Sequence, residues 1–140
     1  EIPEITSGII EIKSVAREAG SRAKVAVYSA VPNIDTIGAC IGQKGARIKN
    51  IVDELNGERI DIVEWKPVVE EFVSAVLSPA VVESVTILED GTARVLVEPS
   101  QLSLAIGKNG QNARLAARLT GMRVDIKVID SEALKEEEDE

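Results

Sequence analysis

The chain has 140 residues, of which 44% are hydrophobic and only 2% aromatic, and its formal net charge is −8. It contains no histidine, the side chain that most readily shuttles protons near neutral pH. No apolar run approaches the roughly 20 residues of a membrane-spanning helix. Its one cysteine, Cys40, excludes an intramolecular disulfide and a cysteine-built zinc site. We therefore expect a cytoplasmic protein that is not an enzyme and uses no metal or cofactor.

Hydrophobic periodicity and turn residues predict strands and helices in the first half of the chain. The expected strands are 8–16, 22–28 and 59–65, with 17–20 as the turn between the first two. The expected helices are a short one that is capped by Asn33 or Asp35 and ends near Ile41, and a second over 46–55. No helix is predicted before the first strand, so we expect the opening helix of this half to be truncated.

The second half repeats this order behind an additional helix. The expected helices are 67–77 with Pro67 at its first position, a short helix through Ile106 that is capped by Ser100, and 111–120 followed by Gly121 as its C-terminal cap. The expected strands are 82–88, 92–97 and 123–129, the first two joined by an Asp-Gly hairpin turn.

The two halves also share their sequence. Residues 41–45 (IGQKG) recur 65 residues later as 106–110 (IGKNG), and 55–62 (LNGERIDI) recur as 119–126 (LTGMRVDI). Such a repeat indicates tandem copies of one small domain. We place the domains at 1–66 and 67–130, with an acidic tail at 131–140. Because a core of about 65 residues is close to the lower limit for independent stability, we expect the copies to pack on each other.

Each copy places a Gly-x-x-Gly turn between two predicted helices. Glycine lacks the Cβ that would keep a ligand from the backbone, and the free amides at the start of the second helix lie at the positive end of its dipole. This arrangement favours phosphate and is typical of KH-type RNA-binding domains. The residues predicted to contact RNA are Gly42, Gln43, Lys44, Gly45, Arg47 and Lys49 in the first copy, and Gly107, Lys108, Asn109, Gly110, Gln111, Asn112 and Arg114 in the second.

The charge distribution agrees with this interpretation, although the net charge is negative. Residues 130–140 contain seven acids and one base, so that segment alone contributes −6. The windows 36–52 and 99–124 contain three and four bases, respectively, and no acid. Phosphate binding depends on the local field, which is positive at both turns. We expect the acidic tail to be dispensable for RNA affinity or mildly inhibitory, because its negative charge would repel phosphate.

Four segments resemble the paired KH domains of the bacterial NusA transcription factors: 15–20 (VAREAG), 37–42 (IGACIG), 56–62 (NGERIDI) and 101–116 (QLSLAIGKNGQNARLA). The resemblance extends to about Ile129. It implies an α+β fold of two tandem type II KH domains, each with a three-stranded sheet covered by helices. It also implies binding of nascent single-stranded RNA, binding of RNA polymerase by the full-length protein, and modulation of pausing, termination and antitermination.

Two other interpretations of the same residues remain open. In the first, the chain is a protein-interaction module, the Gly-x-x-Gly segments are structural turns, and the acidic tail is the active part. In the second, the helices around Gly42–Gly45 form a helix–turn–helix for double-stranded DNA, which leaves the strands without a role. We expect a monomer that binds RNA along aliphatic grooves. The candidates for the groove walls are Ile41, Ile48, Ile62, Ile106, Ala113 and Ile126, although core packing is the favoured role of each.

Overall fold

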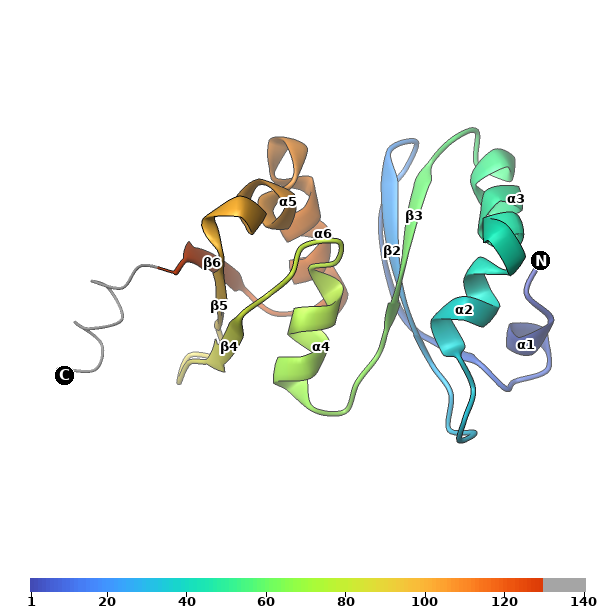
Figure 1. The fold of residues 1–140 in the computed structure, drawn as a ribbon, viewed down its shortest axis with the longest axis horizontal. Helices are drawn as coiled ribbons and strands as arrows, with labels where there is room; N and C mark the ends of the chain where they lie inside the picture. The colour runs from blue at the N-terminus through green and yellow to red at the C-terminus, as the bar shows by residue number, and fades with distance from the viewer. Residues whose placement is uncertain (130–140) are drawn as a thin grey trace, which may run out of the picture.

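A computed structural model describes residues 1–129 and shows two units with the same order of helices and strands (Figure 1). The first unit contains α1 (Pro3–Thr6), β1 (Glu11–Glu18), β2 (Arg22–Tyr28), α2 (Thr36–Ile41), a 3-10 turn (Gln43–Gly45), α3 (Ala46–Glu54) and β3 (Arg59–Glu64). The side chain of Asp35 caps α2 by accepting a hydrogen bond from the Gly38 amide. Asp35 is one of the two residues that were predicted as the cap of this helix.

The second unit is built in the same way. It contains α4 (Val69–Val76), β4 (Ser84–Ile87), β5 (Ala93–Val97), a 3-10 turn (Pro99–Gln101), α5 (Leu102–Ile106), a 3-10 turn (Lys108–Gly110), α6 (Gln111–Thr120) and β6 (Val124–Val128). Gly121 ends α6 in the left-handed conformation, as predicted. Within residues 1–129, none of the helices has the length and apolarity to span a membrane.

The two sheets have one topology. In each, the first strand pairs antiparallel with the second, and the second pairs parallel with the third. The register repeats as well, since Ala23 lies opposite Ile60 in the first sheet and Ala93 lies opposite Val124 in the second. The fold class is therefore confirmed as α+β with two three-stranded sheets and helices, in the element order expected for type II KH domains.

The main hydrophobic core lies between the two sheets. Helices α4 and α6 of the second unit occupy this space, so that the first sheet has helices on both of its faces (Figure 1). Ala16, Ala26 and Val63 from the first sheet belong to the same buried cluster as Val73 and Leu77 of α4. A smaller cluster around Ile10, Val27 and Cys40 lies on the outer face of the first sheet. The expected packing of the two copies on each other is confirmed, and Cys40 is a core residue.

Three local predictions were wrong. Arg17 and Glu18 belong to β1 rather than to the turn, because their backbones pair with Ala23 and Arg22. Ser100 does not cap the helix before the second loop; it lies inside a 3-10 turn that begins with Pro99, and no side chain caps α5. Pro67 precedes α4 without joining it, since Val68 is extended and serves as the N-cap.

The two units differ most at their first helix. The first unit opens with the four-residue α1, whereas the second opens with the eight-residue α4. Helix α4 packs against both β4 and α6 of its own unit. At the equivalent place in the first unit, between α3 and the sheet, lies an apolar cavity of about 260 Å³ whose lining includes Ile5, Val15 and Ile51.

The shared core predicts that the two units unfold together. Leu77 is fully buried, so Leu77→Ala should lower the free energy of unfolding by roughly 2–5 kcal/mol, because apolar burial is lost and a cavity is left behind. Urea unfolding followed by circular dichroism should show one transition, shifted to lower denaturant. Hydrogen exchange should accelerate in both sheets by similar factors. Val69→Ala is the control, because Val69 is 45% exposed, and it should change little. Loss of protection confined to the second sheet would contradict a shared core.

Candidate nucleic-acid interface

The two Gly-x-x-Gly loops have nearly the same backbone conformation. In the first loop, Gly42 has φ 80° and ψ 172°, and Lys44 has φ 54° and ψ 27°. In the second, Gly107 has φ 79° and ψ 167°, and Asn109 has φ 58° and ψ 25°. The duplicated sequence is thus a duplicated local structure, including a non-glycine residue in the left-handed region in each copy.

The two glycines of each loop have different roles. A Cβ on Gly42 would lie 2.9 Å from the Arg47 backbone nitrogen, and a Cβ on Gly107 would lie 2.7 Å from that of Asn112. The first glycine therefore allows the loop to close onto the following helix. A Cβ on Gly45 would meet nothing within 4 Å. The outer side of the loop is open to an approaching ligand.

Both loops lead into helices that lack a side-chain cap. The N-caps of α3 and α6 are Gly45 and Gly110, neither of which has a side chain that can accept from the first-turn amides. These helices have nine and ten residues, long enough for the aligned peptide dipoles to place partial positive charge at their start. An anion at either loop would meet this partial charge and backbone donors together.

The predicted basic residues divide into two classes. Lys44 and Lys108 are exposed loop residues, and neither forms an ion pair within residues 1–129. Arg47 instead donates from Nη1 to both carboxylate oxygens of Glu4 at 2.9 Å and to the Ala39 carbonyl at 2.7 Å. Lys49 is exposed and pairs with Asp53 at 3.2 Å along α3. Thus each loop presents one lysine that is available to a ligand.

Beside the second loop, polar residues contact the first unit. Arg114 donates to the Glu18 carboxylate from Nε and Nη2, and its Nη1 donates to the Asn109 carbonyl at 2.9 Å. Gln111 donates to Glu18 and to the Ser21 hydroxyl. The hydrogen bonds from Arg114, followed by that from Gln111, lower the pKa of Glu18 to about 2. Glu18 therefore anchors two of the predicted RNA-binding side chains.

Asn112 does not lie on the surface, contrary to the prediction that it contacts RNA. Its side chain is fully buried, and Nδ2 donates to the Leu77 and Ala105 carbonyls, each at 3.0 Å. The amide thereby joins α4, α5 and α6. The prediction followed from the position of Asn112 directly after the second Gly-x-x-Gly loop. Because its side chain is buried, Asn112 has a structural role.

Profiles of two domain families match the chain in tandem. The NusA-like first KH domain matches residues 1–65, and the NusA-like second KH domain matches residues 69–134. The chain consists of two tandem NusA-like KH domains. This assignment covers both Gly-x-x-Gly loops and agrees with the repeated fold.

Curated relatives carry the same family name. Transcription termination/antitermination protein NusA of Halalkalibacterium halodurans is 55% identical over 128 residues, which are 91% of this chain and 34% of that protein. The NusA proteins of Bacillus subtilis and Thermus thermophilus are each 54% identical, over 91% and 86% of this chain. The chain spans about a third of the length of these relatives.

A solved structure supports the fold independently. The crystal structure of APE1850 superposes with a TM-score of 0.66 over 90% of this chain and 94% of that one, at 24% sequence identity. At this identity the match supports the fold alone.

Sequence reasoning missed several charged residues near the loops. Glu18, Arg22 and Arg59 line the junction of the two KH domains, and Asp61 binds both arginines. The available signal was the period of two along β1 to β3, which places charged side chains on the sheet face that also carries Ala16, Ala26 and Val63. Charges on a face that is otherwise apolar indicate an interface between domains.

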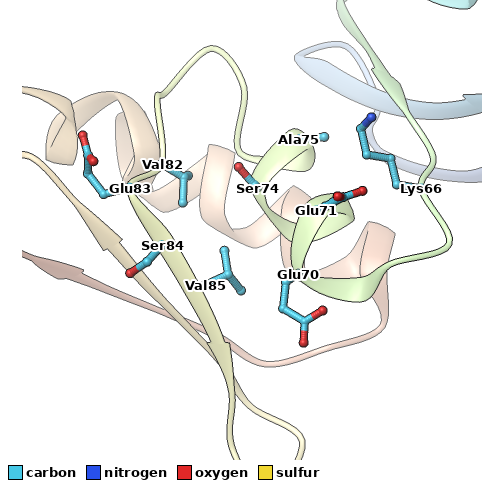
Figure 2. Close-up of a pocket in the computed structure, with 9 residues that line it drawn as sticks. All are labelled: Lys66, Glu70, Glu71, Ser74, Ala75, Val82, Glu83, Ser84 and Val85. Carbon is cyan, nitrogen blue, oxygen red and sulfur yellow. The ribbon is translucent and has the colours of Figure 1, made fainter.

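One surface pocket away from the loops is poorly suited to phosphate. It has a volume of about 510 Å³ and lies between α4 and β4, and Figure 2 shows the carboxylates of Glu70, Glu71 and Glu83 among its lining residues. Lys66 is the one cation of that lining. A negative lining repels a nucleic-acid backbone. Within residues 1–129, no group of three acids or cysteines is arranged to hold a metal ion.

The low pKa of Glu18 predicts a pH dependence of stability. The pKa of Glu18 is lower in the folded protein than in the unfolded chain, so the ionised carboxylate stabilises the fold. This contribution to the free energy of unfolding is fully present above about pH 5 and is lost as the pH falls toward 2. Glu18→Gln removes this titration, so the urea midpoint of the variant should decline less steeply between pH 5 and 2 than that of the wild type. Glu83→Gln, at an exposed carboxylate, is the control and should follow the wild type. Equal slopes for wild type and Glu18→Gln would contradict the assignment.

Proposed function

We propose that the chain binds single-stranded RNA through both Gly-x-x-Gly loops. The observation that carries this proposal is the pair of loops with matching backbone conformation, each with an unpaired lysine and each leading into an uncapped helix. Within a longer protein, this module would contribute to transcription pausing, termination and antitermination, with RNA polymerase as the partner of the whole. We infer a monomeric, cytoplasmic, non-catalytic module.

The binding mechanism divides between backbone and bases. The phosphates lie against the loop amides, where the helix dipole and Lys44 or Lys108 supply positive charge. The bases lie beside each loop, along the edge where α2 contacts β3 and α5 contacts β6. Ile106 is 38% exposed and Leu104 is 47% exposed, which gives the second groove an aliphatic surface. Aliphatic contacts and hydrogen bonds to base edges then take the place of aromatic stacking.

Substitutions in the loops test this proposal most directly. We expect Gln43→Asp with Lys44→Asp, or Lys108→Asp with Asn109→Asp, to weaken RNA binding by about 10- to 1,000-fold. Two like charges about 4 Å apart repel by roughly 1 kcal/mol in water and 4 kcal/mol near a protein surface. Aspartate tolerates the left-handed conformation of Lys44 and Asn109, so the thermal midpoint should change little. Fluorescence anisotropy with a labelled twelve-nucleotide RNA measures the affinity.

A matched control changes the charge equally but away from the loops. Lys66→Asp with Ser84→Asp changes the charge of the pocket in Figure 2 by the same three units. We expect this variant to bind RNA nearly as the wild type does. The four-substitution loop variant should fall to background while remaining folded. Wild-type affinity in that folded variant would exclude the proposal and would favour a protein-interaction module.

The fixed arrangement of the units predicts a minimum RNA length. One KH domain contacts about four nucleotides, so both together should need roughly eight to twelve. In calorimetric titrations, affinity should rise steeply between a four- and a twelve-nucleotide RNA. It should also fall with salt, because phosphate contacts release counterions. Equal affinity for both lengths would show that the units do not bind one strand.

A further inference from the structure

A surface pocket at the junction of the two KH domains has the composition of an anion site. Its volume is about 340 Å³, and it lies against the second Gly-x-x-Gly loop. No acidic residue is among its lining residues, which are Ser21, Arg22, Arg59, Pro79, Ser103, Leu104, Gly107, Lys108 and Gln111. We call it the junction pocket. It combines hydroxyl groups and cations from both domains.

The cations at the base of the junction pocket outnumber the acids that they contact. The carboxylate of Asp61 forms ion pairs with Arg22, Lys24 and Arg59. Lys24 Nζ lies 3.0 Å from Asp61 Oδ2, and Arg59 Nε lies 3.5 Å from Asp61 Oδ1. Lys24 is fully buried, and its Nζ also donates to the Ser78 carbonyl at 2.8 Å. Burial lowers the pKa of Lys24, and the neighbouring arginines add to this effect. One carboxylate therefore faces three cations, which leaves a local excess of positive charge.

The guanidinium of Arg22 retains donor capacity toward the pocket. Its Nε and Nη2 both donate to Asp61 Oδ2, and no partner for Nη1 lies within residues 1–129. The fold does not require an arginine here. By the register of the two sheets, the equivalent residue of the second domain is Thr92, which is buried without a charge. The first domain thus has a cation that its duplicate lacks.

The location of the pocket indicates the ligand. Strand β3 is one of the two edge strands of the first sheet and contacts α2, the helix before the first loop. Its first residue, Arg59, lines the junction pocket, as do Gly107 and Lys108 of the second loop. The pocket thereby connects the base-binding edge of the first domain to the phosphate-binding loop of the second.

We propose that the junction pocket binds a backbone phosphate of the RNA where one strand passes from the first KH domain to the second. Arg59 and Lys108 contact the phosphate from opposite domains, and Arg22 donates through Nη1 from the base of the pocket. This inference rests on the proposed function, because it needs RNA on both loops. It adds a third phosphate site that belongs to neither domain alone.

Arg59→Ala tests the pocket with little risk to the fold, because this side chain is 60% exposed and its one ion pair is the 3.5 Å contact with Asp61. We expect three- to thirty-fold weaker binding of a twelve-nucleotide RNA and a salt dependence reduced by about one charge. Lys66→Ala is the matched control, since Lys66 likewise pairs with an acid two residues away, at 3.7 Å. Its affinity and salt dependence should equal those of the wild type.

Replacing single phosphates of the RNA by neutral methylphosphonates locates the contact. At one internal position, the replacement should weaken binding to the wild type but not to Arg59→Ala. If the loop variants lose RNA while Arg59→Ala keeps the wild-type affinity and salt dependence, the pocket inference fails and the proposed function stands. If wild-type protein binds no RNA, the proposed function itself fails.

The Arg59→Ala variant also shows whether the junction pocket binds a phosphate of RNA or free inorganic phosphate. Titration of inorganic phosphate, followed by amide chemical shifts of Ser103 to Gln111, should show no saturable binding at millimolar concentration. Saturable phosphate binding that Arg59→Ala removes, and that does not compete with RNA, would assign the pocket to a free anion and overturn the inference.

Discussion

The arrangement of the whole molecule depends on the contact between the first sheet and helix α6. Alanines at positions 16 and 26 leave room for the helix to approach the strands closely, and the Ser14 hydroxyl donates to the Leu119 carbonyl at the end of that helix. The N-terminus of α6 carries the second Gly-x-x-Gly loop. One helix therefore packs on the sheet of the first domain and carries the second Gly-x-x-Gly loop, so the position of that loop is fixed relative to the first domain.

Charged pairs surround this apolar contact and set its register. Glu18 holds Arg114 at one end of the first sheet, while Lys24 reaches the Ser78 carbonyl in the loop after α4. A buried lysine is costly to desolvate unless its donors are satisfied, and the contacts with Asp61 and Ser78 satisfy two of them. A shift of one domain along the other would break these pairs. Apolar burial supplies the attraction, and the charges select the orientation.

Much of this structure follows from the sequence, because the repeat and the helical periodicity are local signals. Helix α6 was predicted to the residue, and both loops were located by their glycines. The errors come from tertiary contacts: Glu18 was assigned to a turn although pairing with Arg22 extends the strand, and Asn112 was assigned to the surface although it is buried. The sequence also did not show which cations are unpaired, because Arg47 and Arg114 form ion pairs with acids that lie 43 and 96 residues away in the chain.

The duplicated loops have come to lie in different electrostatic settings. Beside the first loop, Arg47 is held by Glu4 of its own domain; beside the second, Arg114 is held by Glu18 of the other domain. The geometry of the first loop is therefore a property of one domain, whereas that of the second depends on the junction. Both settings neutralise an arginine on the helix and leave the loop lysine unpaired. The junction supports the second loop and also carries its own excess of cations. In the proposed function, it would therefore join the two loops into one surface for a phosphate backbone.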